Sequence, residues 1–159
     1  MLKYLGLLMI ASAGILISRE YEKKEKKRLF ELSEFIRLLE HVRLKISSFL
    51  SPKSDWLSSF SAESSPISEF LGFAEAHSLS ESFDFVKDKL SLGAERDTLA
   101  RLFATLGKTY KDGEIELLDE GIAELNERRE KLSEECEKNI KTVKVLVAAI
   151  SLGLIILFL

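Results

Sequence analysis

Two uncharged, largely apolar stretches at the ends of the chain constrain its fold more than any other feature. Tyr4–Ser18 and Val145–Leu159 each run for fifteen residues without a charge, although charged residues make up 31% of the whole chain. Fifteen helical residues span about 22 Å, whereas a bilayer core of about 30 Å needs roughly 20 residues. Neighbouring apolar residues lengthen both stretches if Lys3 and Lys144 reach toward lipid head groups.

The sequence therefore predicts a membrane anchor over residues 1–18 and a second over residues 143–159. The side chains expected within the membrane are Leu5, Leu8, Ile10, Ile15, Ile17, Val147, Ile150, Leu154, Ile156 and Leu157. Two alternatives stay open. Ala11-Ser12-Ala13 has the form of a signal-peptide cleavage site, although the basic cluster follows this stretch and does not precede it. The C-terminal stretch could also be a buried core helix.

Basic residues beside the two stretches predict their orientation. Six follow the first stretch and one precedes it, and three precede the second stretch with none after it. They are Arg19, Lys23, Lys24, Lys26, Lys27 and Arg28, with Lys3, and then Lys138, Lys141 and Lys144. Lysine and arginine near membrane spans stay on the cytoplasmic side. We expect a plasma-membrane protein with two passes, a cytoplasmic domain over residues 19–142 and both termini outside.

The charge of this domain argues against nucleic acid as its partner. Setting aside Lys3 and Lys144 leaves 21 basic residues against 26 acidic ones, a net charge of −5. A nucleic-acid-binding domain usually carries a basic patch and a positive net charge. The single cysteine, Cys136, cannot form an intramolecular disulfide, which fits a reducing compartment.

Apolar spacing predicts an all-α domain, a compact antiparallel bundle of five or six helices with no strand. Glu20–Leu50 contains no proline or glycine, and Ser51-Pro52 should end this helix. Its two apolar stripes are Leu29, Leu32, Ile36, Leu39 and Ile46, and Phe35, Leu38, Val42 and Phe49. A final helix should run into the C-terminal anchor, with an inward seam of Leu118, Ile122, Leu125, Leu132, Cys136, Ile140 and Val143. These two long helices should pack antiparallel.

Shorter helices are expected between the long ones. Trp56, Leu57 and Phe60 have helical spacing, and Ile67, Phe70, Leu71 and Phe73 suggest a helix to about Ala76. Ser80 is the expected N-cap of the next helix, whose inward residues are Phe83, Val86, Leu90 and Phe85, with a stop at Gly93. Another helix should run from about Asp97 to Gly107, and Asp112-Gly113 should break the chain before the last one.

No constellation of catalytic, cofactor-binding or metal-binding residues emerges from the sequence. His41 and His77 fall in different predicted helices, without cysteine or paired carboxylates at metal-ligand spacing. Cys136 lies among acidic neighbours on a helix seam, which suits a packed thiol better than a nucleophile. We therefore expect a protein that is not an enzyme and carries no cofactor or metal.

The order of these segments resembles a known family. "MLKYLG" opens an anchor, "FIRLLEHVRLKI" forms a leucine-rich helix, and "LFATLGKTYKDGEIELLDEGIAELNERREKLSEECEKNIKTVKVL" enters the last anchor. The most specific part is Leu106-Gly107-Lys108 followed by Asp112 and the long charged helix. Over essentially the whole chain this layout looks like the stage III sporulation protein AB family.

The resemblance implies a mother-cell membrane component of the channel complex that joins mother cell and forespore. It implies a domain similar to the helical bundle of type II secretion platform proteins. Its expected partners are a cytoplasmic secretion-type ATPase, of the stage III sporulation protein AA family, and other channel subunits, and homo-oligomers are compatible with it. The acidic start of the last helix, Glu114, Glu116, Asp119 and Glu120, is our candidate partner-binding surface. A membrane-tethered helical regulator of cell division or envelope processes remains the alternative.

Overall fold

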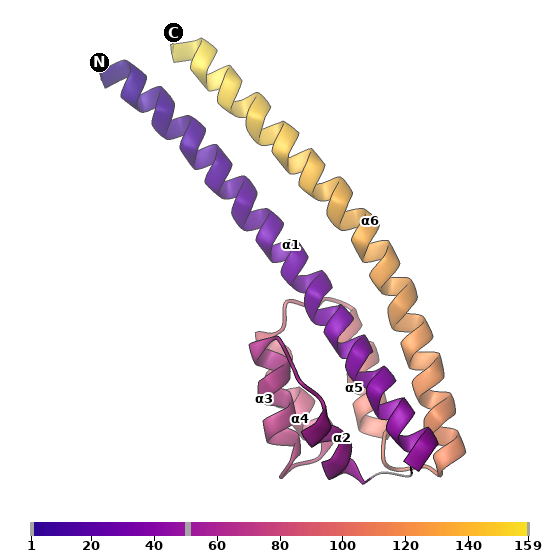
Figure 1. Ribbon diagram of the computed structural model, residues 1–159. Coiled ribbons are helices and arrows are strands. Elements are labelled where there is room, and N and C mark those ends of the chain that lie inside the picture. The colour runs from indigo at the N-terminus through magenta and orange to yellow at the C-terminus, as the bar shows by residue number, and fades with distance from the viewer. Residues whose placement is uncertain (1, 50–51, 159) are drawn as a thin grey trace. The chain divides into compact units, whose positions relative to one another are not determined.

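The computed structural model describes residues 2–49 and 52–158, and the side chains of residues 9, 12–48, 52–154 and 156. The elements in chain order are α1 (Leu2–Phe49), α2 (Lys53–Ser59), α3 (Ser65–Ala74), α4 (Leu79–Val86), the 3-10 turn η1 (Lys87–Lys89), α5 (Glu95–Thr105) and α6 (Lys111–Phe158). Figure 1 shows these helices in space. For the described residues the predicted all-α fold, with six α-helices and no strand, is confirmed.

The chain divides into two compact units. Unit 1 consists of Met1–Lys27 and Leu132–Leu159, and unit 2 consists of Arg28–Lys131. α1 and α6 each contribute residues to both units, whereas α2 to α5 belong to unit 2. The limits of these units do not test the predicted limits of the anchors, at residues 18 and 143, which stay predictions.

The core of unit 2 is built around one face of α1. The Phe35 ring lies 6.0 Å from the ring of Phe70 in α3, 6.0 Å from Phe83 in α4 and 6.1 Å from Phe103 in α5, measured between centroids. All four rings are buried, and aromatic pairs at such separations add stability beyond the area they bury. Most of the two predicted stripes of α1 lines this core, with Leu32, Ile36, Leu38, Leu39, Val42 and Ile46 buried. Leu29 is half-buried, and the side chain of Phe49 lies outside the described ones.

Two carboxylates of α1 are buried in unit 2 and hold its connecting loops. Glu34 accepts a hydrogen bond from the backbone amide of Ser64 at 3.0 Å, just before α3. Glu31 accepts one from the backbone amide of Ser91 at 2.6 Å, between η1 and α5. Such bonds satisfy backbone amides in connecting segments that have no partner within a helix. Both side chains are almost entirely excluded from solvent, although neither was expected to be buried.

The two long helices run antiparallel in each unit, as predicted. In unit 2, Lys111 near the start of α6 donates to the backbone oxygen of Ser47 near the end of α1, at 2.8 Å. In unit 1, Lys144 of α6 pairs with Glu22 of α1 at 2.7 Å. Leu118 and Leu125 of the predicted α6 seam are fully buried, and Leu132 and Cys136 are nearly so, whereas Ile122, Ile140 and Val143 are only half-buried.

Two predicted helix starts differ from those observed. Ser78, not Ser80, caps α4, because its hydroxyl accepts from the Glu81 amide while the Glu81 carboxylate accepts from the Ser78 amide, a capping box. The turn before α6 is made at Gly107, whose φ of 87° favours glycine, so that the proposed break at Asp112-Gly113 lies inside α6. α1 ends at Phe49, and Leu50 and Ser51 lie outside the described residues.

The end of α4 also differs from the prediction. This helix stops at Val86 and continues as η1, so Gly93 is not its stop and lies in the segment before α5. Phe83, Val86 and Leu90 are buried as predicted, but Phe85 is 49% exposed. The prediction for Phe85 was wrong because a helix this short buries a single stripe.

Among the described residues, no helix is long and apolar enough to cross a membrane, so the structure gives no support to the two predicted membrane-spanning helices. Of the side chains assigned to them, Ile15, Ile17, Ile150, Leu154 and Ile156 are exposed and Val147 is half-buried. The side chains of Leu5, Leu8, Ile10 and Leu157 lie outside the described ones.

Candidate functional site

The four acidic residues predicted to bind a partner have two different environments in unit 2. Glu114 accepts a hydrogen bond from the backbone amide of Gly107 at 2.9 Å, which ties α6 to the preceding turn. Asp119 accepts two hydrogen bonds from the Arg43 guanidinium, one of them at 3.0 Å, so it joins α6 to α1. Hydrogen bonding and charge from Arg43 hold the pKa of Asp119 below its ordinary value. These two carboxylates have structural partners.

Glu116 and Glu120 are the two that remain available to a ligand. Both side chains are exposed, and neither makes an ion pair or hydrogen bond with a described residue. With Asp112, Ile115 and Asp119 they line a surface hollow of about 480 Å³. The structure therefore brings three of the four predicted residues, Glu116, Asp119 and Glu120, to one hollow. Only two of the four acidic groups remain unpaired among the described residues.

A groove between α5 and α6 adjoins this surface, because Glu120 lines both. Its volume is about 430 Å³, and its walls include Leu102 and Thr105 of α5 and Leu117 and Gly121 of α6. At its other end Glu124 accepts from the Thr98 hydroxyl at 2.9 Å and from Arg101 at 3.3 Å. The sequence analysis missed this groove, and Gly121 was the one available signal. A Cβ on Gly121 would lie 2.5 Å from Leu102 Cδ2, so the glycine permits the close approach.

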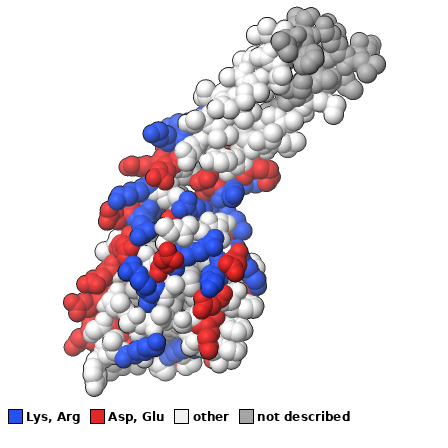
Figure 2. All heavy atoms as spheres, turned by 180° about the vertical axis from the view of Figure 1, so that it is seen from behind, with Lys and Arg blue, Asp and Glu red and all other residues white. Residues whose placement is uncertain are grey.

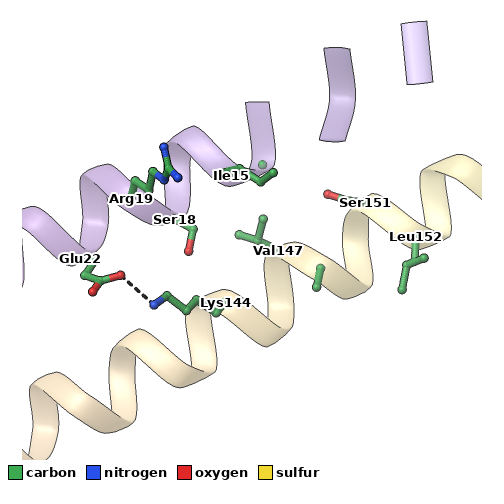
Figure 3. A pocket seen from close by; sticks show the side chains of 10 residues that line it. Ile15, Ser18, Arg19, Glu22, Lys144, Val147, Ser151 and Leu152 are labelled. Carbon is green, nitrogen blue, oxygen red and sulfur yellow. Dashed lines mark ion pairs between the residues drawn. The ribbon is translucent and has the colours of Figure 1, made fainter. Parts of the chain in front are cut away.

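Unit 1 carries a groove of its own between α1 and α6, shown in Figure 3. Its volume is about 510 Å³. Ile15, Val147 and Leu152 form its apolar part, and Ser18, Arg19 and the Glu22–Lys144 ion pair lie toward its charged end. The small residues Gly14 and Ser151 face one another across the helix pair, since a Cβ on Gly14 would lie 2.9 Å from Ser151 Oγ.

Glu22 is the electrostatic centre of this part of unit 1. Its carboxylate accepts a hydrogen bond from Lys144 at 2.7 Å and from Lys26 at 2.6 Å. These two bonds lower the pKa of Glu22 to about 2, so that it is ionised throughout the physiological range. Lys144 therefore lies beside a permanent counter-charge on the neighbouring helix.

Charged and uncharged surfaces are separated within unit 1. Figure 2 shows blue and red charged side chains over one part of the surface, and a white, uncharged surface from there to the residues drawn in grey. The exposed large apolar side chains on this uncharged part are Met9, Ile15, Leu16, Ile17, Val145, Leu146, Ile150, Leu152, Leu154 and Ile156. A continuous exposed apolar surface of this kind marks a region that binds protein or lipid.

The histidines and the cysteine contact neighbouring side chains, and Cys136 is packed as predicted. His77 was predicted to lie in a helix, but it lies in the segment between α3 and α4. His41 Nε2 lies 2.9 Å from Ser59 Oγ, and burial lowers the pKa of His41. The His77 ring stacks on Phe73 with centroids 3.8 Å apart. The Cys136 side chain is 4% exposed, and burial followed by the charge of Glu25 raises the pKa of its thiol. A buried thiol with a raised pKa is a poor nucleophile.

Comparison with known proteins agrees with the order of segments described above. A family model for stage III sporulation protein AB matches residues 3–159, which is nearly the whole chain. No curated protein and no solved structure gives a significant match. The resemblance found in the sequence is confirmed.

Proposed function

The chain belongs to the stage III sporulation protein AB family, and from this membership we propose that it is a membrane-anchored scaffold subunit of the mother cell–forespore channel complex. A role in stage III sporulation follows from the family itself. The scaffold role is our inference, and the match along the chain from residue 3 to residue 159 is the observation that carries it. We propose a structural role, without catalysis, for the same reason.

The exposed apolar surface of unit 1 supports membrane attachment. Soluble monomers seldom expose a continuous apolar surface of this extent, and here it is bordered by lysine and arginine. Basic residues beside an apolar segment favour the cytoplasmic face of the membrane and its anionic lipids. We propose the mother-cell plasma membrane as the location, with unit 2 in the cytoplasm and both termini outside.

Reporter fusions test this orientation. Fusions ahead of Met1 and after Leu159 should be active outside the cytoplasm, and an insertion at Ser64 should be active inside it. Ser64 precedes α3 in a connecting segment, which tolerates insertion better than a helix does. A cytoplasmic reporter after Leu159 contradicts the second anchor, and an external reporter at Ser64 contradicts the whole orientation.

The proposed partner of unit 2 is the cytoplasmic secretion-type ATPase of the stage III sporulation protein AA family. Glu116 and Glu120 are the surface through which it would dock, because they are acidic, exposed and unpaired within the described structure. Charge pairs at the rim of an interface act mainly on association rate and salt dependence. The acidic surface should therefore bind a basic surface of the ATPase in a salt-sensitive way.

Capture of the purified ATPase by the detergent-solubilised full chain tests the scaffold role. Glu116→Lys with Glu120→Lys should weaken capture and reduce its dependence on salt, while helix content is unchanged. Glu40→Lys with Glu130→Lys is the matched control, because it changes the charge equally at two other exposed positions of unit 2. Equal loss in both double variants would exclude a specific role for this surface. Absence of capture by the unmodified chain would overturn ATPase docking.

A further inference from the structure

A stack of aromatic rings at the surface, on α3, α4 and the segment between them, is not used by the core or by the proposed ATPase surface. The rings of Phe73 and Phe85 are parallel within 8°, with centroids 4.6 Å apart. On Phe73 the ring of His77 also stacks, within 7° and at 3.8 Å. Phe85 is 49% exposed and His77 is exposed. These three rings form what we term the aromatic stack.

A cation already lies on this stack. Lys89 Nζ is 4.4 Å from the centroid of the Phe85 ring. The same ammonium group pairs with the Glu69 carboxylate, and its hydrogen bond lowers the pKa of Glu69. A carboxylate and an aromatic face therefore converge on one positive charge at the protein surface.

This combination suits a guanidinium group better than an ammonium group. Arginine is planar, stacks on aromatic faces, donates two parallel hydrogen bonds to a carboxylate and is more weakly hydrated than lysine. Lys89 offers a compact, strongly hydrated charge on a flexible stem, and its side chain is 46% exposed. An arginine from outside could displace it without disturbing the core.

The net acidic charge around the aromatic stack favours a basic binding partner. Residues 65–90 contain five acidic residues and two lysines, Lys87 and Lys89. The acidic residues are Glu69, Glu75, Glu81, Asp84 and Asp88. Opposite charge steers a basic surface toward this side of unit 2 and disfavours an acidic one.

We propose that the aromatic stack is a docking site for an arginine presented by a basic segment of a partner protein. The guanidinium takes the position over Phe85 that Lys89 holds in the free chain, and Glu69 accepts its hydrogen bonds. Lys89 then turns into solvent. Aromatic residues and arginine are the side chains most enriched where protein interfaces concentrate their binding energy.

Two peptides of equal length and charge test this site without the ATPase. One carries arginines and the other carries lysines at the same positions, with glycine and serine between them. Fluorescence polarisation with the detergent-solubilised full chain should show that the arginine peptide binds about three- to tenfold more tightly, as expected of one cation–π contact. Equal affinity of the two peptides for the unmodified chain would overturn the proposal.

Matched variants separate the aromatic stack from general electrostatics. Phe85→Ala should abolish the arginine preference, whereas Phe30→Ala should keep it, because Phe30 is a comparably exposed phenylalanine, 44% against 49%, for which no ring contact is seen among the described residues. Phe85→Leu keeps the apolar bulk and should also lose the preference if Phe85→Ala proves unstable. A preference that survives both Phe85 variants would contradict the site.

The two lysines provide a second pair of variants. Lys89→Gln should strengthen binding of the arginine peptide more than Lys87→Gln does, because Lys87 pairs with Asp84 and no ring contact of Lys87 is seen among the described side chains. Both lysine side chains are 46% exposed, so the change in net charge and its exposure are the same. Equal effects of the two substitutions would show that only net charge matters and would overturn the assignment of Phe85 as the contact.

Discussion

Unit 2 and unit 1 share the two long helices but differ in the burial of their apolar side chains and in their net charge. Of the apolar side chains buried among the described residues, only Leu132 and Cys136 belong to unit 1. Of the fourteen large apolar side chains that are exposed among the described ones, ten belong to unit 1. The net charges of the two units also differ. Unit 2 has 14 basic and 20 acidic residues, a net charge of −6, and unit 1 has 9 basic and 6 acidic residues, a net charge of +3. Unit 2 is an acidic folded core, and unit 1 is a basic helix pair with an apolar exterior.

This difference teaches where the stability of the chain comes from. The α2 to α5 helices are 7 to 11 residues long, too short to be stable alone, and they gain stability by burying apolar faces against α1 and α6. The helix pair of unit 1 buries few apolar side chains, and the exposed ones add no stability to the fold in water. Substitutions in unit 2 should therefore change folding, whereas those in unit 1 should change attachment or pairing.

The largest effect is expected from a charge placed in the core of unit 2. Leu39→Asp or Leu125→Asp, both at fully buried positions, should lower the free energy of unfolding by about 3–5 kcal/mol, because the carboxylate must be neutralised or exposed. Leu44→Asp, at a position that is 59% exposed, is the control and should cost less than about 1 kcal/mol. Chemical denaturation followed by circular dichroism measures both. Equal losses at the buried and exposed positions would contradict the proposed core.

An intermediate effect is expected where helices approach closely. Gly121→Val should lower the unfolding free energy of unit 2 by about 1–3 kcal/mol, because its side chain would overlap Leu102. In unit 1, a Cβ at Gly14 would lie 2.9 Å from Val147 Cγ1, but the helix pair there can separate without opening a core. We expect no change in the thermal unfolding of unit 2 from Gly14→Val. A loss as large as that of Gly121→Val would show that the two units unfold together.

The smallest effects concern two ion pairs and their pH dependence. Burial alone would raise the pKa of Glu95, but backbone amides, including that of Gly93, and the Arg28 guanidinium outweigh it and keep the pKa below the ordinary 4.5. The folded state thus favours the ionised form, and this contribution is present above about pH 4.5 and disappears as pH falls through the folded pKa. Glu95→Gln should cost about 1–2 kcal/mol at neutral pH and less in acid.

Glu22 in unit 1 is the counterpart of Glu95 and should behave differently. Its pKa of about 2 comes from hydrogen bonds to exposed lysines, so Glu22→Gln should lower the unfolding midpoint less than Glu95→Gln does. Titration of the Glu22 carboxyl by nuclear magnetic resonance should find the low pKa at low salt and a rise toward 4.5 at high salt, because salt screens exposed charges. A Glu95 pKa that moved with salt as much as that of Glu22 would remove the distinction between the two pairs.

Much of the helical content could be predicted from the sequence because helix periodicity is local. The stripe of Leu32, Ile36 and Leu39 repeats at three and four residues, so any buried face of that helix had to include it. The same holds for Leu118 and Leu125 in α6. The family was visible from the order of such segments along the chain, and the match over residues 3–159 confirmed it.

The tertiary structure alone decided how polar and aromatic side chains are used. The acidic residues at the start of α6 could be named from the sequence, but Arg43, 76 residues before Asp119, determines which of them remain available. Phe85 fitted an inward position by spacing, yet it is exposed because this short helix buries only the face that carries Leu79, Phe83 and Val86. Spacing along a helix determines which side chains share a face, whereas the partner of each side chain comes from distant parts of the chain, and only packing brings the two together.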